Sequence, residues 1–168
     1  LATLVHPTRK SVNLPEFPFL LEMIPRVTII ACGTSFYAGL VAKYWLEKYA
    51  RVPVECDIAS EFRYRELEME PGGLTIFISQ SGETADTLAA MRYCREQKQH
   101  ILAVVNVAES SMAREADALL LTCAGPEIGV ASTKAFTTQL TVLACFAISM
   151  AIEKGMIDNE LAARLCFA

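Results

Sequence analysis

The stretch VTIIACGTS, residues 27–35, decides the fold that we predict for this chain. Its first part, Val27–Ala31, is a short apolar and β-branched run that is typical of a buried strand. Its second part, Cys32–Ser35, consists of small residues and includes a glycine, which favours a tight turn. An amphipathic stretch from Phe36 to Tyr49 follows, so the local order is strand, turn and helix.

The same order recurs along the chain. We predict further strands at Val54–Ile58, Leu74–Ile78, Ile101–Val105 and Ala118–Leu121, and further helices at Ala85–Gln97, Ser110–Ala116 and Thr133–Lys154. Strands that are apolar throughout require a sheet covered on both faces, and strands that alternate with helices indicate parallel pairing. The sequence therefore predicts an α/β fold: a three-layer αβα sandwich whose five-stranded parallel sheet has the flavodoxin-like order 2-1-3-4-5.

The chain divides into a lead-in and one domain. Residues 1–25 contain Pro7, Pro15, Pro18 and Pro25, so we expect an extended segment with one short turn of helix around Phe19–Ile24. The whole chain has 168 residues, of which 53% are hydrophobic, enough to bury one sizeable core. We therefore assign residues 26–168 to a single domain.

Composition and charge exclude several classes of protein. Fifteen Lys and Arg residues against nineteen Asp and Glu give a net charge of −4, so there is no basic field to hold a nucleic acid. The stretch Ala135–Ile152 carries no charge, but its apolar core, Val142–Ile152, is about half of the roughly 20 residues that a membrane span needs. We predict a buried core or interface helix there and no membrane partner.

The six cysteines indicate a reduced, cytoplasmic protein. Each is isolated in the sequence, without a CxxC pair or a histidine at ligand spacing, so we expect no zinc site. Most lie in apolar runs, where a thiol behaves as a small buried hydrophobic group.

Two turns carry the chemistry that the fold predicts. In an open parallel sheet, ligands bind beyond the carboxyl ends of the strands where the strand order reverses, here between the first and third strands. The loops at that point are Cys32–Ser35 and Ser79–Thr84, and both precede helices whose free N–H groups favour an anion. Neither loop contains Lys or Arg, which excludes a Walker A motif, and no GxGxxG follows a strand, so the pattern favours a monophosphate.

A simpler interpretation is that these hydroxyl residues cap helices, which is the commonest use of Ser and Thr at such positions. That alternative is favoured for Thr34 and Ser35 taken alone. The second loop places Ser79, Ser81 and Thr84 around Gly82, which is more hydroxyl groups than one cap needs. For this loop the anion site is the favoured interpretation.

A third turn, Ala124–Lys134, connects the last strand to the long helix, with Ser132 or Thr133 as its expected N-cap. Its Glu127 and Lys134 are either acid/base groups or, more simply, an ion pair. His6 lies in the lead-in, and His100 precedes a strand at the wrong edge of the sheet for a ligand. We therefore assign no catalytic residue.

Four segments resemble one known family. They are Ala31–Ser35, Ala59–Arg65, Ser79–Thr87 and Glu127–Gln139, and the resemblance extends from about Val27 to Lys154. All four are similar to the sugar isomerase (SIS) domain. The Ser79–Thr87 segment alone resembles phosphosugar-binding SIS domains in general, whereas Glu127–Gln139 resembles the first SIS half of the glutamine–fructose-6-phosphate aminotransferase family.

The resemblance implies a set of site residues. Ser79, Gln80, Ser81 and Thr84 would hold the phosphate, and Thr34, Ser35, Val130, Ala131 and Ser132 would line the sugar. It also implies that no metal or organic cofactor is used. In the family, the acid/base residues of the isomerase lie largely outside the part that this chain matches.

The implied activity belongs to a longer enzyme, which passes the amide nitrogen of glutamine as ammonia to fructose 6-phosphate and isomerises the product to glucosamine 6-phosphate. This chain would bind fructose 6-phosphate or glucosamine 6-phosphate but would not turn it over alone. Its partners would be a second SIS half and a glutaminase domain, in a homodimer, and a first residue Leu1 fits such a fragment. The alternative is a stand-alone phosphosugar-sensing or regulatory SIS module.

Overall fold

The computed structural model of the chain describes residues 4–6, 11–125 and 133–166. Its centre is a five-stranded sheet of β3 (Val27–Ala31), β4 (Val54–Ile58), β5 (Leu74–Ser79), β6 (His100–Val105) and β7 (Ala118–Leu121). The strand order is β4-β3-β5-β6-β7 and every neighbouring pair is parallel. This is the predicted order 2-1-3-4-5, so the predicted fold class is confirmed.

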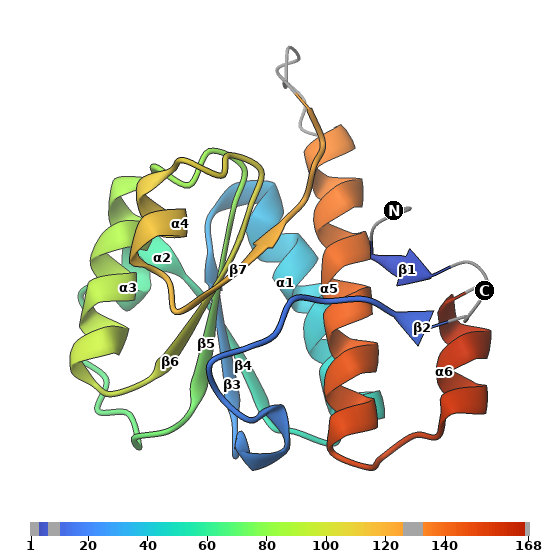
Figure 1. Cartoon of the computed structure of the whole chain (residues 1–168). Coiled ribbons are helices and arrows are strands. Elements are labelled where there is room, and N and C mark those ends of the chain that lie inside the picture. Colours follow the sequence, from blue (N-terminus) through green and yellow to red (C-terminus); the bar gives the residue numbers. More distant parts are fainter. Residues whose placement is uncertain (1–3, 7–10, 126–132, 167–168) are drawn as a thin grey trace.

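Helices cover both faces of the sheet (Figure 1). One layer holds α1 (Gly33–Trp45), its π-helical extension η2 (Leu46–Ala50) and α5 (Thr133–Glu153), which lie side by side. The other layer holds α2 (Ala59–Phe62), α3 (Ala85–Glu96) and α4 (Ser111–Glu115). The sandwich therefore has the three layers that the apolar strands require.

β3 and β5 send alternate side chains into two separate cores, as the two-residue period of a strand requires. Ile29 and Ile76 are opposite each other in the β3–β5 register and face the core under α1 and α5. The next pair in that register, Ile30 and Phe77, faces the core under α2, α3 and α4. All four side chains are buried, which explains why these strands are apolar throughout.

The lead-in has more structure than an extended segment. β1 (Val5–His6) pairs antiparallel with β2 (Ser11–Val12), and the predicted helical turn is the 3-10 helix η1 (Leu21–Met23). Leu21 is fully buried in the core beneath α5, so this segment packs onto the domain. The division of the chain at residue 25 stays a prediction.

Two helices were not predicted, the short α2 and the last described helix, α6. α6 (Asn159–Cys166) follows α5 and packs against it and against β2. Its single buried residue is Ala162. Figure 1 shows α6 outside the three-layer sandwich, on the far side of α5.

The uncharged stretch 135–152 forms most of α5. Among the helices of the described residues, α5 is long and apolar enough to cross a membrane, with a mean hydropathy of 1.8, but 56% of that window is buried. It contributes Val142, Phe146 and Met150 to the core shared with α1 and the sheet. Of the two predicted alternatives, a core helix and an interface helix, the structure shows that α5 contributes to the core.

Candidate functional site

The carboxyl ends of β3 and β5 lie next to each other at the centre of the sheet, with Ala31 opposite Ile78. The chain leaves β3 into α1 and β5 into α3, so two helix N-termini open at this edge. Each N-terminus presents backbone N–H groups without intrahelical acceptors, and the helix dipole makes it favourable to a negative charge. The reversal of strand order thus lies where the sequence predicted it.

The loop between β5 and α3 is organised around Ser79, the last residue of β5. Its side chain is almost fully buried, and its Oγ accepts a hydrogen bond of 3.0 Å from the Gly82 N–H. The Thr84 Oγ1 lies 3.5 Å from the same oxygen. Ser79 and Thr84 are therefore held together inside one tight turn, as the sequence grouped them.

Ser81 repeats this arrangement at the surface of the same loop. Its Oγ accepts a 3.2 Å hydrogen bond from the Glu83 N–H. A serine hydroxyl has one hydrogen to donate besides its acceptor lone pairs, so Ser81 keeps a donor after serving the loop. Ser79 and Thr84 share a contact in which either hydroxyl can donate, so one of their two hydrogens is also left for a ligand. The loop is consequently a cluster of neutral donors with a fixed backbone.

The loop is fixed from outside by α4. The Met112 N–H donates to the Gly82 carbonyl at 3.1 Å, and the Ser111 N–H donates to Glu83 Oε1 at 2.7 Å. Gly82 has a φ of 68°, and a Cβ there would lie 2.3 Å from the Ser110 Oγ. Only glycine fits this position, because Ser110 is buried and caps α4.

Glu83 turns its charge away from the loop. Hydrogen bonds from the Ser111 N–H and hydroxyl, together with the nearby Arg114 guanidinium, lower the pKa of the Glu83 carboxyl. The carboxylate is therefore ionised at neutral pH and serves as an acceptor at the N-terminus of α4. An anion in the loop then meets the loop hydroxyls rather than this carboxylate.

The alternative prediction that Thr34 and Ser35 cap the helix after the first loop is wrong. Cys32 is the N-cap of α1, so Thr34 and Ser35 lie inside the first turn rather than before it. Gly33, two residues after the end of β3, has a left-handed φ of 56°, a conformation that favours glycine. At α3 the N-cap is Thr84, but its side chain makes no capping hydrogen bond.

The two residues of this first turn have different surroundings. Thr34 is exposed, whereas Ser35 is only 8% exposed. The Ser35 Oγ accepts a 3.0 Å hydrogen bond from Nε2 of Gln139. Gln139 lies on α5, 104 positions after Ser35 in the sequence. Ser35 is therefore positioned by a distant buried residue.

Gln80 lies on the other side of the loop and lines an open crevice of about 570 Å³ beside Asn106 and Cys123. The Gln80 carbonyl accepts a 3.1 Å hydrogen bond from the Asn106 N–H. The Asn106 side chain accepts from the Ala124 N–H at 2.7 Å and donates to the Gly125 carbonyl at 2.9 Å. Asn106 thus ties the loop after β5 to the segment after β7.

Charged groups near this edge are paired with one another. Arg63, which follows α2, forms a 2.6 Å ion pair with Asp86 in the first turn of α3. This pairing raises the pKa of the Arg63 guanidinium above its usual value. Among the described residues, no group of three or more His, Cys, Asp and Glu side chains gathers as a metal site requires.

Several predicted residues lie outside the part of the chain that the structure describes. They are Glu127 and the sugar-lining candidates Val130, Ala131 and Ser132, of which Ser132 was also an N-cap candidate. Lys134 is the second residue of α5 and is exposed. His100 lies at the start of β6, the amino edge of the sheet, as predicted.

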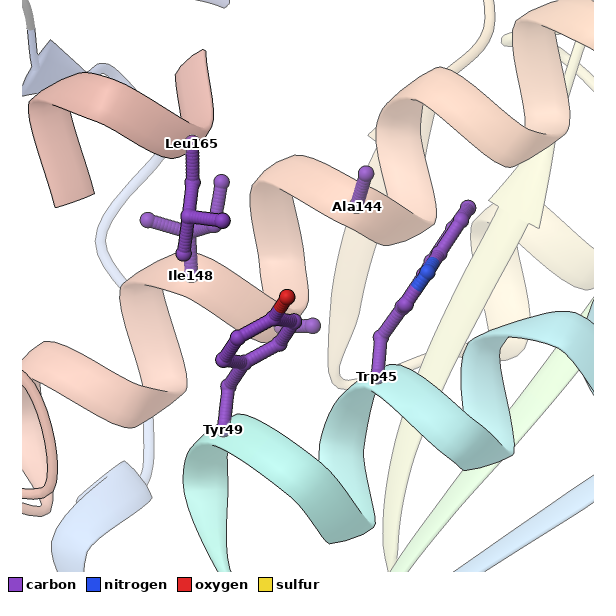
Figure 2. A pocket seen from close by; sticks show the side chains of 6 residues that line it. Trp45, Tyr49, Ala144, Ile148 and Leu165 are labelled. Atoms are coloured by element: carbon purple, nitrogen blue, oxygen red, sulfur yellow. The ribbon is translucent and has the colours of Figure 1, made fainter. Parts of the chain in front are cut away.

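A second hollow, between α1, η2, α5 and α6, is lined by apolar side chains. Trp45, Tyr49, Ala144, Ala147, Ile148 and Leu165 line a pocket of about 180 Å³, and Figure 2 shows Trp45 and Tyr49 facing α5 across it. We call it the apolar groove. Its lining offers no charged group, so the groove has no means to orient a phosphate.

The sequence did not identify Glu83, Asn106 or Gln139 as functional residues. Asn106 follows the carboxyl end of β6 directly, so the strand-end rule applied to every strand would have found it. Gln139 is a polar residue on the buried face of an apolar helix, which is also a visible signal. Their partners, in contrast, are set by tertiary packing.

The fold and the motifs at this edge define the class of protein. Residues 20–149 match the SIS domain family, and the chain belongs to that family. The predicted family is therefore confirmed.

Within that class, the chain is similar to glutamine–fructose-6-phosphate aminotransferases (isomerizing). It is 62% identical over 160 residues to the enzyme of Zymomonas mobilis, and 57% identical over 161 residues to that of Bradyrhizobium diazoefficiens. Each match covers 95% of this chain and 26% of the relative, so the chain spans about a quarter of the length of these curated relatives.

A solved structure gives the same result. The C-terminal domain of glucosamine-fructose-6-phosphate aminotransferase from Francisella tularensis superposes with a TM-score of 0.90 at 46% identity. The match covers 94% of this chain and 45% of that chain.

Proposed function

We propose that this chain is the first SIS half of a glutamine–fructose-6-phosphate aminotransferase (isomerizing) and binds fructose 6-phosphate or glucosamine 6-phosphate. The observation that carries the proposal is the β5–α3 loop, Ser79–Thr84, at the N-terminus of α3. The identity to such aminotransferases over 95% of the chain supports the choice of substrate class.

The phosphate would be held by neutral donors. Ser79, Ser81 and Thr84 supply hydroxyl groups, Gln80 an amide, and α3 its first backbone N–H groups. Each hydrogen bond to a charged oxygen contributes about 1.5–3 kcal/mol net, so phosphate alone binds weakly and the sugar adds affinity. In this proposal Thr34, Ser35, Val130, Ala131 and Ser132 line the sugar.

The chain would supply binding rather than turnover. In the proposed reaction of the whole enzyme, water hydrolyses the amide of glutamine to give glutamate and ammonia, and the ammonia adds to the C2 carbonyl of fructose 6-phosphate with loss of one water to form an imine. A proton then moves from C1 to C2 and the O1 proton passes to the nitrogen, which leaves the aldehyde at C1 and the amine at C2 of glucosamine 6-phosphate. No acid/base pair is assigned to the described residues, so the proton transfer is left to the second SIS half, without metal or organic cofactor.

The proposed partners are the second SIS half, the glutaminase domain and a second copy of the enzyme in a homodimer, in the cytoplasm. The apolar groove supports such a contact, because its aliphatic and aromatic lining lies on the outer layer of the domain. On α1 next to it, Tyr37 and Tyr44 are 61% and 70% exposed and lie on one face of the helix at i and i+7.

The phosphate site is tested by titrating fructose 6-phosphate into the isotope-labelled chain and following the backbone amide signals. We expect shifts in residues 79–84, and we expect Ser81→Asp to abolish them because its carboxylate repels the phosphate. Glucose, which lacks the phosphate, serves as the matched ligand control and leaves the loop unshifted. Shifts confined to other parts of the chain would overturn the site.

The proposed place in a longer enzyme is tested by adding the separately expressed remaining domains of a relative. Formation of glucosamine 6-phosphate from glutamine and fructose 6-phosphate is the expected result. Failure with correctly folded parts, together with a reading frame that ends near Ala168, would favour a stand-alone sugar phosphate-sensing module.

The proposed contact at the apolar groove has a built-in probe, because Trp45 is the only tryptophan of the chain. Its emission is expected to shift to shorter wavelength as the chain concentration rises, in step with association measured by sedimentation. A monomeric sedimentation profile at high concentration, with unchanged Trp45 emission, would contradict self-association.

A further inference from the structure

Gln139 is a buried polar residue for which packing alone gives no reason. It lies in the second turn of α5 and is 1% exposed, on the same helix face as Ala135, Val142 and Leu143. A methionine or leucine would fill the same space without an amide to desolvate. The amide is nevertheless present, and among the described residues its hydrogen-bond partner is Ser35.

The direction of this hydrogen bond determines what Ser35 can do. Gln139 Nε2 donates to Ser35 Oγ at 3.0 Å. The hydroxyl therefore acts as the acceptor toward α5, and its own hydrogen is left to donate elsewhere. Within the described part of the chain, that hydrogen has no acceptor.

The other end of the amide is left unsatisfied. Gln139 Oε1 is fully buried and has no hydrogen-bond partner among the described residues. A buried acceptor without a partner destabilises the fold, and such local conflicts are characteristic of functional positions. The amide thus costs stability while it fixes the orientation of one serine next to the reversal of strand order.

We propose that Gln139 is a positioning residue that holds Ser35 as a hydrogen-bond donor to an acceptor oxygen of the sugar phosphate. The inference rests on the proposed function, because it requires the ligand to reach the first turn of α1. It goes further by assigning a direction to the Ser35 hydrogen bond and a role to a residue of α5. Gln139 acts through Ser35 and does not contact the ligand.

Two substitutions separate shape from hydrogen bonding. Gln139→Met keeps the length of the side chain and removes the donor, whereas Gln139→Asn keeps the amide and withdraws it from Ser35 by one methylene group. Each is expected to raise the Kd for fructose 6-phosphate about tenfold, the effect of one oriented hydrogen bond. Having both variants keeps the test usable if one of them fails to fold.

The decisive measurement is a double-mutant cycle with Ser35→Ala. If Gln139 acts through Ser35, Gln139→Met has no further effect on the Kd once Ser35 lacks its hydroxyl. A merely structural role would weaken binding by the same factor in both backgrounds. Circular dichroism and urea unfolding accompany each variant, so that folded chains are compared.

Gln99→Met is the matched control. Gln99 is also a buried glutamine, 6% exposed, but its Nε2 donates to the Glu70 and Gln97 carbonyls near the amino edge of the sheet. Its substitution is expected to lower stability and leave the Kd for fructose 6-phosphate unchanged.

The outcomes distinguish this inference from the proposed function. If the unmodified chain binds no fructose 6-phosphate, both are overturned. If it binds with shifts in residues 79–84 but the Gln139 variants bind equally well, or weaken additively with Ser35→Ala, only the role of Gln139 is overturned. Non-additive weakening supports it.

Discussion

The β5–α3 loop and the apolar groove are two concave regions of the same domain, and they differ in nearly every property. In the loop, the Oγ atoms of Ser79 and Ser81 accept hydrogen bonds from backbone N–H groups of the turn, and Thr84 Oγ1 lies 3.5 Å from Ser79 Oγ. Gly82 and Glu83 anchor the loop to α4. The groove, drawn in Figure 2, is lined by aliphatic and aromatic side chains between α1, η2, α5 and α6.

This difference in lining shows that a pocket in the surface does not by itself identify a binding site for a charged ligand. The groove can exclude water but cannot replace the hydrogen bonds that a phosphate loses on leaving it. The loop adjoins the open crevice that Gln80 lines, and its donors are held by contacts from Asn106 and α4. The two regions are therefore suited to different partners: a phosphorylated small molecule and another protein surface.

The largest effect is expected from breaking the loop at Gly82. Gly82→Ala forces a Cβ to within 2.3 Å of the Ser110 Oγ at a φ of 68°, so we expect the free energy of unfolding to fall. The left-handed backbone and the clash together cost about 2–5 kcal/mol. Urea unfolding measures the change.

Gly155→Ala is its matched control. Gly155 has a φ of 67°, but a Cβ there would meet no atom within 4 Å. The strain of the left-handed backbone therefore acts alone, and we expect it to lower the free energy of unfolding by about 1 kcal/mol. Equal losses for the two variants would show that the contact between the loop and α4 does not constrain Gly82.

A smaller effect is expected from the groove. Trp45→Ala removes half-buried apolar surface, which we expect to lower the free energy of unfolding by about 1–2 kcal/mol. The affinity for fructose 6-phosphate should stay unchanged, because the groove lies away from the loop. Weaker sugar phosphate binding in this variant would mean that the two regions are coupled.

The smallest effect concerns the charge of Glu83. Its pKa is lowered in the folded chain by the Ser111 hydrogen bonds, so the stability that it contributes is present above the unfolded glutamate pKa of about 4.3 and is lost as the pH falls through the lower folded value. Glu83→Gln should therefore be less stable than the unmodified chain at pH 7, with the gap closing below pH 4. Thermal unfolding across that pH range checks the sign, and a gap that persists in acid would assign the effect to packing.

The sheet was predictable because its information is local. The limits of β3, β4 and β7 coincide with those of the predicted strands. The β1–β2 pair and the helices α2 and α6 were not predicted. The two-residue strands and the four-residue helix α2 are too short to show a periodicity.

The candidate site was predictable only in part, for a related reason. The position of Ser79, Ser81 and Thr84 at a strand end is a local property, and so is the glycine between them. The start of α1 at Gly33 was missed, because the sequence does not show that this glycine adopts a φ of 56°. The Gln139–Ser35 hydrogen bond spans 104 positions, and no window along the chain contains both residues.

The anchorage of α5 has a consequence for the order in which the chain can fold during synthesis. The side chain of Lys154, just after α5, donates to the Glu22 and Ile24 carbonyls, 132 and 130 positions earlier. Until α5 has left the ribosome, the face of the sheet that includes Ile29 and Ile76 lacks a large part of its cover. The strands are made early, but the domain is expected to reach its stable state only after nearly the whole chain has been translated.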